Sequence, residues 1–541
     1  MSQMLKSSAA LAVATLVSRV LGLVREMAYA RFMGTGWVAS AFIFAFQIPN
    51  LFRRLLGEGA LTAAFIPQFK EKEKTEGEAA MWHAANAVLS GLVATALLIT
   101  GLAILGISIA LHFRAFSAQT RLMLELLRTM FPYMALVCVA AVCMGMLNAR
   151  GRFFIPALGA ALLNVIMITS VLAIAPLAPW IGRELPDQIQ VLAVGVIFAG
   201  LAQAAFQIPS LRREGWRFQW INPWPDPTVR EVVRRMIPTT LGVAAFQLNV
   251  VITQSFAFFL GESIVASFQY AVRLMELPQG LFGASLATYI LPTLSGFAAD
   301  RDYNRFRATL MQGLSYLAVV NLLAGALLAA LAEPIVRLLL EGGRFHATDT
   351  GNVAQALLFL SPGLVAFSAT NILARAFYAV GDTRVPMQIS VFCLATNAIL
   401  SVIFALPLHA AGLGLANTLT AVANAGLLAY ALRRKFPKLD YSKLGNDTVR
   451  MLAAAAAAGL VAWGLAHLWQ ATIGADTLLR RTGAVFLPAL AASALYFSGL
   501  WFGKVTAAQE ILTAAGRALG RLRKRPGSDG TGAGKGLHEN N

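Results

Sequence analysis

Charged side chains are scarce in this chain. They make up 13% of its 541 residues, whereas hydrophobic residues make up 57% and the mean hydropathy is +0.65. A soluble domain carries about 25% charged residues. The shortage of charge therefore excludes an ordinary soluble protein and indicates a chain that crosses a membrane many times.

Cysteine and histidine are also rare. The three cysteines, Cys138, Cys143 and Cys393, lie in apolar runs without metal-ligand spacing, which predicts core packing. The six histidines are scattered, and no Ser/His/Asp or paired-carboxylate arrangement accompanies them. We therefore expect no enzyme active site, no metal and no cofactor.

Long apolar runs fill most of the chain. A membrane-spanning helix needs about 20 mostly apolar residues, and about fourteen segments meet this requirement. They lie near 8–32, 37–56, 84–112, 122–148, 153–175, 189–209, 235–260, 264–297, 309–332, 354–380, 386–406, 411–432, 449–470 and 482–502. The sequence predicts an all-α polytopic membrane protein.

Two short motifs recur in the same order. The stretch ending at Pro67 resembles the one ending at Pro292, and the stretch ending at Pro156 resembles the one ending at Pro386. The repeat predicts two homologous six-helix lobes, related by an axis along the membrane normal. Coincidence among Ala, Leu and Pro is the alternative. The predicted units are an N-terminal lobe (1–210), a basic linker (211–234), a C-terminal lobe (235–440), two additional helices (441–503) and a basic tail (504–541).

Basic residues gather in every second loop. By the positive-inside rule these loops are cytoplasmic, and so are both termini. The formal net charge of +18 then reflects orientation, and we expect no nucleic-acid partner. The amphipathic basic run after Lys504 predicts a tail that lies on anionic membrane lipids, with a solvated tail as the alternative. The basic loops lie at 70–74, 150–152, 212–235, 301–307 and 433–438.

Several arginines lie inside or at the ends of apolar segments. One arginine at the centre of a lipid-facing helix costs roughly 2.5 to 3.5 kcal/mol. We therefore expect these side chains to face a protected, hydrated space. They are Arg19, Arg25, Arg53, Arg54 and Arg273.

Three glutamates accompany the arginines. Glu26 shares a helical stripe with Arg19, while Arg25 falls about 120° away, so the spacing pairs Glu26 with Arg19 only indirectly. Glu58 and Glu276 each follow an arginine, by four and three residues, within pairing distance along a helix.

Five arginines against three glutamates leave two positive charges. Internal ion pairs that hold helices together are one explanation, but such pairs need no surplus, and uncompensated buried charge is costly. The surplus favours an anion-binding cavity. The planar arginine fork donates two parallel hydrogen bonds to a phosphate, so a diphosphate matches this charge.

At these motifs the chain resembles a known family, the MurJ (MviN) lipid II flippases of the multidrug/oligosaccharidyl-lipid/polysaccharide exporter superfamily. The resemblance runs from about residue 4 to about residue 505 and is most specific in the first sixty or so residues. The motifs that carry it are Ser18-Arg19-Val-Leu-Gly, Arg25-Glu26, Gln47-Ile-Pro-Asn-Leu-Phe-Arg53-Arg54 running to Glu58-Gly59-Ala60, Ala271-Val-Arg273-Leu-Met-Glu276 with Pro278, and Phe377-Tyr378 running to Asp382-Thr383.

The resemblance implies two six-helix lobes around a central cationic cavity, alternating access, and two C-terminal helices that help to form a groove for a polyprenyl tail. It implies a flippase that moves lipid II from the cytoplasmic to the periplasmic leaflet of the bacterial inner membrane during cell-wall synthesis, with wall-synthesis enzymes as further partners. By the family pattern, Arg19, Arg25, Arg53 and Arg273 contact the diphosphate or gate its site, and Glu26 occupies an acidic position.

Two departures from the family pattern matter. Ser40 stands where several members have an aspartate, so a gating salt bridge from that position is absent. Where some members bind sodium through acidic residues, this chain offers Gln247, Asn249 and Asn397 without a carboxylate. A sodium site is therefore not expected, and membrane potential or protons become the expected drivers.

Two rival hypotheses stay open. One is an exporter of another lipid-linked oligosaccharide, or a multidrug exporter, on the same architecture. A basic cavity argues against cationic drugs but not against other lipid-linked sugars. The other is a membrane scaffold for cell-wall synthesis enzymes.

Overall fold

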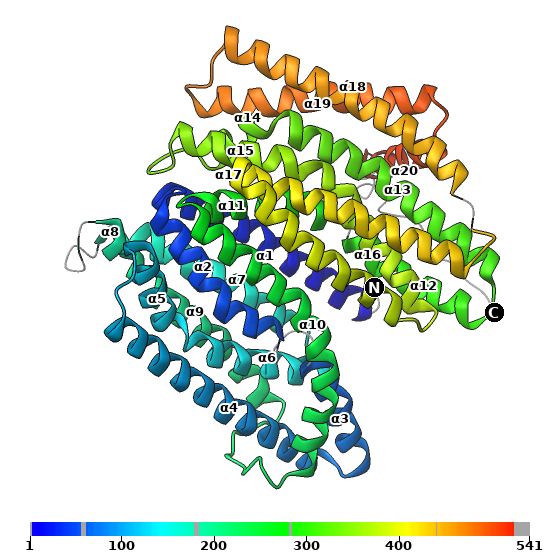
Figure 1. The fold of residues 1–541 in the computed structure, drawn as a ribbon. Coiled ribbons are helices and arrows are strands. Elements are labelled where there is room, and N and C mark those ends of the chain that lie inside the picture. The colour runs from blue at the N-terminus through cyan, green and yellow to red at the C-terminus, as the bar shows by residue number, and fades with distance from the viewer. Residues whose placement is uncertain are drawn as a thin grey trace, which may run out of the picture.

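The computed structural model describes residues 3–55, 61–177, 182, 184–280, 284–439 and 441–523. Within these ranges the chain is a bundle of helices without strands, apart from one isolated bridge between Gly342 and Phe345. Figure 1 shows α18 and α19 along one side of the bundle and α4 along the opposite side.

Most helices of the first half of the bundle follow the predicted apolar segments. The helices of this half are α1 (Gln3–Met33), α2 (Trp37–Phe52), α3 (Leu61–Thr75), α4 (Glu78–Phe113), α5 (Ala118–Met130), α6 (Tyr133–Ala149), α7 (Phe154–Thr169), η2 (Ser170–Ile174), α8 (Ala175–Leu177) and α9 (Leu185–Arg213). However, α3 lies between two of the predicted segments, and the predicted segment 122–148 divides into α5 and α6.

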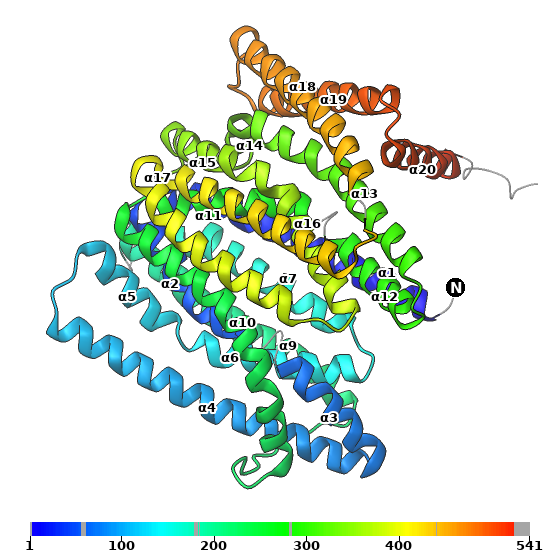
Figure 2. The same ribbon diagram turned by 45° about the vertical axis from the view of Figure 1, so that its right-hand side comes forward.

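The second half continues from the basic linker. Its helices are α10 (Pro227–Leu260), α11 (Ile264–Pro278), α12 (Ala284–Ala299), α13 (Tyr303–Ala330), α14 (Ala332–Leu339), α15 (Ala347–Leu360), η4 (Ser361–Gly363), α16 (Leu364–Ala379), α17 (Arg384–Lys435), α18 (Ser442–Thr472), α19 (Leu478–Phe502) and α20 (Thr506–Arg523). Figure 2 shows α20 at the end of α19, and α20 packs beside α13.

The prediction of an all-α polytopic membrane protein is confirmed. Eight helices in the described ranges are long and apolar enough to cross a membrane, and the pair α5–α6, bent by 41°, would add a ninth. The predicted number of fourteen is not confirmed. The 52-residue α17 is counted as one of the eight helices, although His409 (φ 50°, ψ −125°) interrupts it.

The break in α17 reverses the chain. A Cβ on Gly412 would overlap the carbonyl oxygen of Phe404, which shows how closely the two limbs approach. The limbs correspond to the separately predicted segments 386–406 and 411–432. In contrast, the single predicted segment 264–297 divides into α11 and α12, and Pro278, which has no N–H to continue the hydrogen-bond ladder, is the last residue of α11.

The internal repeat is visible in two turns 230 residues apart. Gly151, between α6 and α7, and Gly381, between α16 and α17, have φ values of 76° and 75°, a conformation that favours glycine. Arg152 donates its N–H to the carbonyl of Leu147 (2.8 Å), and Asp382 donates to Phe377 (3.0 Å). Equal spacing and equal hydrogen bonding support two homologous halves.

The α1–α2 turn is sealed against the loop before α15. The N–H of Arg344 donates to the carbonyl of Arg31 (2.8 Å), and the Thr35 hydroxyl hydrogen-bonds to the Asp349 carboxylate. A Cβ on Gly343 (φ 58°) would overlap the Arg31 carbonyl, so the two backbones meet directly. This end of the bundle is therefore closed between its two halves.

Candidate functional site

A cavity of about 530 Å³ opens between α1 and α11, with α16 contributing one side chain. Five of the predicted site residues line it, together with Asn371. Those five are Arg19, Arg25, Glu26, Arg273 and Glu276. The structure therefore brings charged side chains from both halves of the chain into one space.

Glu26 lies at the centre of this arrangement. Its Oε1 is 2.5 Å from Nη2 of Arg25 on the same helix and 3.7 Å from Nε of Arg273 on α11. The residue is only 8% exposed. Glu26 thus links the two halves, and its partners are Arg25 and Arg273 rather than Arg19, because a long guanidinium reaches around the helix to the next residue.

Arg25 is held from a third helix. Its Nη1 donates to Oδ1 of Asn164 on α7 (3.0 Å), and Nδ2 of Asn164 donates to the carbonyl of Ser18 (3.1 Å). The guanidinium also lies over the Tyr29 ring, 5.5 Å from its centroid. Sequence reasoning missed Asn164, although an isolated asparagine in the apolar segment 153–175 was a signal.

The remaining charged side chains of the cavity are more open. Arg273 Nη1 lies 2.7 Å from Oε2 of Glu276, which is half-exposed. This confirms the predicted pairing along the helix. Arg19 is exposed, and its guanidinium packs directly against Gly280, where a Cβ would overlap Nη1. Gly280 therefore makes room for Arg19.

Among the residues that the structure describes, three arginines and two glutamates line the cavity, so their formal surplus is one positive charge. The sequence predicted a surplus of two because it grouped Arg53 and Arg54 with the others. Neither is among the described side chains that line the cavity. Glu58, the predicted partner of Arg54, lies outside the described residues.

Arg53 and Arg54 lie at the end of α2 and have other partners. Nε of Arg53 donates to Oδ1 of Asn50 (2.8 Å), and Nη1 of Arg54 donates to Oε1 of Gln247 on α10 (3.4 Å). Both are half-buried. The Arg54 contact connects the end of α2 to the second half of the chain, whereas the Arg53 contact stays within α2 and its end.

Ser40 makes a contact that an aspartate would change. Its buried hydroxyl accepts a hydrogen bond from the N–H of Ala266 near the start of α11 (3.3 Å). In this chain the position therefore joins α2 to α11 through a neutral hydrogen bond. No carboxylate is needed for that contact.

A second charged cluster, here named the Arg150 cluster, joins α3, the α6–α7 turn and the end of α9. Arg150 contacts Glu73 (2.5 Å) and Glu214 (3.2 Å), and Arg152 contacts Glu214 (2.8 Å). The hydrogen bond from Lys70 lowers the pKa of Glu73, and the one from Arg152 lowers the pKa of Glu214. The cluster comprises Lys70, Arg150 and Arg152 with Glu73, Glu78 and Glu214.

In the part of the chain that the structure describes, no group of three His, Cys, Asp or Glu side chains is placed so that it could hold a metal ion. Two of the neutral residues at the family's sodium positions are engaged elsewhere. Gln247 accepts from Arg54, and Asn397 donates to Thr420 (3.4 Å).

Comparisons with known proteins identify the family of this chain. A family model described as "Lipid II flippase MurJ" matches residues 29–482. The "Probable lipid II flippase MurJ" of Vibrio cholerae is 32% identical over 86% of this chain and 89% of its own length. The "Lipid II flippase MurJ" of Burkholderia cenocepacia is 32% identical over 90% and 94%.

Solved structures share the fold. One titled "Lipid II flippase MurJ, inward closed conformation" superimposes with a TM-score of 0.71 at 22% identity, over 91% of this chain and 99% of that chain. An inward-facing multidrug resistance transporter of the MATE family, in the MOP superfamily, gives 0.63 at 15% identity, over 79% and 96%. With a family model that spans most of its length and relatives above 30% identity, this chain belongs to the lipid II flippase MurJ family.

Proposed function

We propose that this protein is a lipid II flippase that moves the undecaprenyl-diphosphate-linked peptidoglycan precursor across the bacterial inner membrane without changing it chemically. Family membership supports the substrate. The observation that carries the mechanism is the cavity between α1 and α11, where arginines outnumber glutamates. One negative charge of a diphosphate offsets the single surplus positive charge of the described lining residues, and the other competes with Glu26 for the guanidinium groups.

Glu26 provides the means by which substrate binding changes the protein. In this structure the Glu26 carboxylate is shared by Arg25 and Arg273, one from each half of the chain. A diphosphate that binds both guanidinium groups competes with Glu26 for them. A ligand shifts a conformational equilibrium only by binding the two states differently, and this exchange of partners supplies that difference.

The orientation follows from the basic loops. With those loops in the cytoplasm, the sealed α1–α2 turn is periplasmic, and the cavity receives substrate from the cytoplasmic side. The hydrogen bonds of Thr35 and Arg344 must break for the site to open outward. Thr35 is buried, and Arg344 also donates to the Phe32 carbonyl and to Gln188. Substrate binding must therefore offset the loss of several hydrogen bonds, each of about 1 kcal/mol.

The driving force is proposed to be the membrane potential or protons, because neutral side chains occupy the family's sodium positions. A cavity with an arginine surplus moves net charge when it changes access, which couples it to a potential at about 2.3 kcal/mol per charge per 100 mV.

The test is a lipid II accessibility assay in bacteria depleted of their own flippase and supplied with this chain. Arg25→Ala should abolish transfer to the outer leaflet. Arg121→Ala, which removes an exposed arginine on α5, should support transfer at the level of the unmodified chain. Collapse of the membrane potential should stop transfer by the unmodified protein.

Three outcomes would contradict the proposal. Full activity of Arg25→Ala would remove the cavity from the mechanism. Normal growth of the depleted cells with Arg25→Ala, without lipid II transfer by the variant, would favour a scaffold. Transfer of another lipid-linked oligosaccharide but not lipid II would identify a different exporter of the same superfamily.

A further inference from the structure

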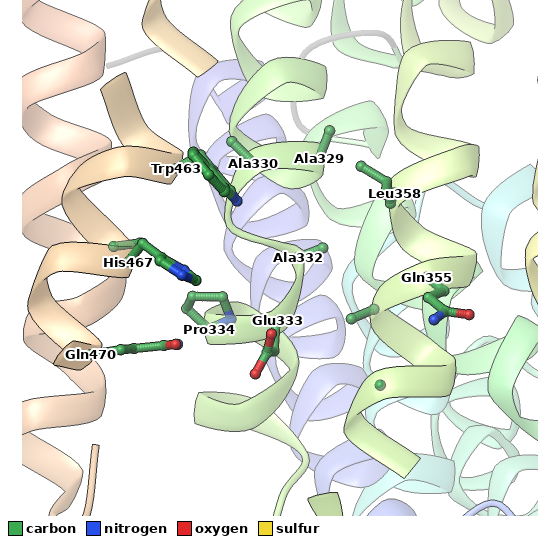
Figure 3. A pocket seen from close by; sticks show the side chains of 13 residues that line it. Ala329, Ala330, Ala332, Glu333, Pro334, Gln355, Leu358, Trp463, His467 and Gln470 are labelled. Atoms are coloured by element: carbon green, nitrogen blue, oxygen red, sulfur yellow. The ribbon is translucent and has the colours of Figure 1, made fainter. Parts of the chain in front are cut away.

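A second pocket, of about 300 Å³, lies between α18 and the helices α13, α14 and α15 (Figure 3). Small side chains make the space, among them Ala330, Ala354 and Ala466. Gly351 on α15 leaves further room, because a Cβ at that position would meet no atom within 4 Å. The pocket lies outside the arginine cavity and shares none of its lining residues.

The lining has the chemistry of a cation site. Glu333, Gln355 and Gln470 supply carboxylate and amide oxygens, and neither lysine nor arginine is among the described lining residues. Trp463 stacks on His467 with ring centroids 5.3 Å apart and exposes more than half of its surface. A carboxylate beside an exposed indole face attracts an ammonium group.

The Glu333 carboxylate is held in place by an arginine on the same helix. Nη2 of Arg337 lies 2.6 Å from its Oε1, and Arg337 also faces Glu341, which is 3.0 Å from Arg481. Glu333 is the outer end of this chain of charges, with its side chain 52% exposed against 23% for Arg337. In the view of Figure 3 the carboxylate lies between the side chains of α18 and those of α15.

The surroundings are lipid-facing. Leu358 and Trp463 at the pocket edge are exposed on helices that are long and apolar enough to span a membrane. In the orientation proposed above, α13 starts in the cytoplasm and ends at this pocket, which places the pocket at the level of the outer leaflet. A ligand there has an ammonium group on an apolar body.

We propose that this pocket binds the ethanolamine headgroup of an outer-leaflet phospholipid. The primary ammonium donates hydrogen bonds to the Glu333 carboxylate and to the glutamine amide oxygens, and its charge faces the Trp463 ring. The acyl chains lie along Leu358. An ethanolamine headgroup is preferred to choline, because a quaternary ammonium has no N–H to donate.

The test is lipid retention by the full-length protein, measured by native mass spectrometry after equilibration with equal amounts of ethanolamine, choline and glycerol phospholipids. The ethanolamine lipid should be retained over the glycerol lipid by about tenfold, the ratio expected for one charge-assisted contact. Glu333→Gln should remove this preference. Asp476→Asn, which removes an exposed acid from the neighbouring turn, should keep it.

A second variant separates binding from folding. Gly351→Leu fills the pocket without a clash and replaces a helical glycine by a better helix former, so the protein should unfold at the same temperature or higher while losing the bound lipid. Equal retention of the three lipids by the unmodified protein, or unchanged retention by both pocket variants, would overturn the proposal.

Discussion

The arginine cavity and the Arg150 cluster both hold three basic side chains, but they balance them differently. In the Arg150 cluster three glutamates face three bases, and the contacts join α3, a turn and the end of α9. In the cavity three arginines share two glutamates beside an open volume of about 530 Å³.

The difference separates structural from binding charge. A network in which every base has an acid gains nothing from a further anion and is best explained as a brace between elements. A cavity short of one acid holds charge that is costly when uncompensated, and an entering anion removes that cost. The explanation of internal ion pairs therefore applies to the Arg150 cluster and not to the cavity.

After Arg25→Ala, the largest effect on transport is expected from Arg273→Ala. The substitution leaves two arginines against two glutamates, so the cavity loses its surplus and one of its two bridges to Glu26. Loss of a guanidinium with two charge-assisted hydrogen bonds to a phosphate should slow transport by about a hundredfold. The measurement is the initial rate of lipid II transfer in proteoliposomes.

Two further variants sharpen this prediction. Arg273→Lys keeps the charge without the fork, and its rate should lie between those of Arg273→Ala and the unmodified protein. Arg305→Ala, at an exposed position after a basic turn, serves as the matched control. An unmodified rate for Arg273→Ala would show that the surplus has no part in transport.

Asn164→Ala should have a smaller effect on the same site. Asn164 positions Arg25 and does not line the cavity, so its loss loosens the guanidinium without removing it. We expect the lipid II concentration for half-maximal transport to rise by about tenfold. Asn446→Ala, at an exposed position on α18, should leave it unchanged; an equal effect of the two substitutions would exclude a positioning role.

Arg150→Ala should lower the stability of the protein and leave transport nearly unchanged, unlike the substitutions in the cavity. Loss of a partly buried arginine with three acidic neighbours should lower the free energy of unfolding by about 1 to 2 kcal/mol, while transport stays within about twofold. Thermal unfolding and the transport assay on the same preparation check both parts. A stable variant without transport would mean that the Arg150 cluster also acts on substrate.

Acidification is expected to have the smallest effect of these changes, and the stability of the protein should not change near neutral pH. The pKa values of Glu73 and Glu214 are lowered in the folded protein by hydrogen bonds from Lys70 and Arg152. Their stabilisation is therefore complete above the unfolded value of about 4.3 and is lost as the pH falls through the lower folded pKa values. The melting temperature should fall in that window, and the fall should be smaller in Glu214→Gln; an identical pH profile would contradict this assignment.

The two turns of the repeat show what sequence comparison could reach. The motif ending at Pro156 and its counterpart ending at Pro386 predicted the repeat, and the paired glycines Gly151 and Gly381 have the same conformation. The residues that follow these glycines have opposite charges, since Arg152 pairs with Glu214 whereas Asp382 pairs with Lys435. Backbone geometry is shared by the two halves, while side-chain partners differ.

The sequence by itself determined the membrane class, most of the helices, the family and the charged residues of α1 and α11, because hydropathy and helical spacing act within one segment. Only the tertiary structure decided which arginines share a cavity. Arg25 meets Asn164 139 residues away, Arg19 packs on Gly280, and Arg53 turns to Asn50. Periodicity assigns each side chain to a face of its own helix, but the rotation of one helix against another depends on packing over the whole bundle.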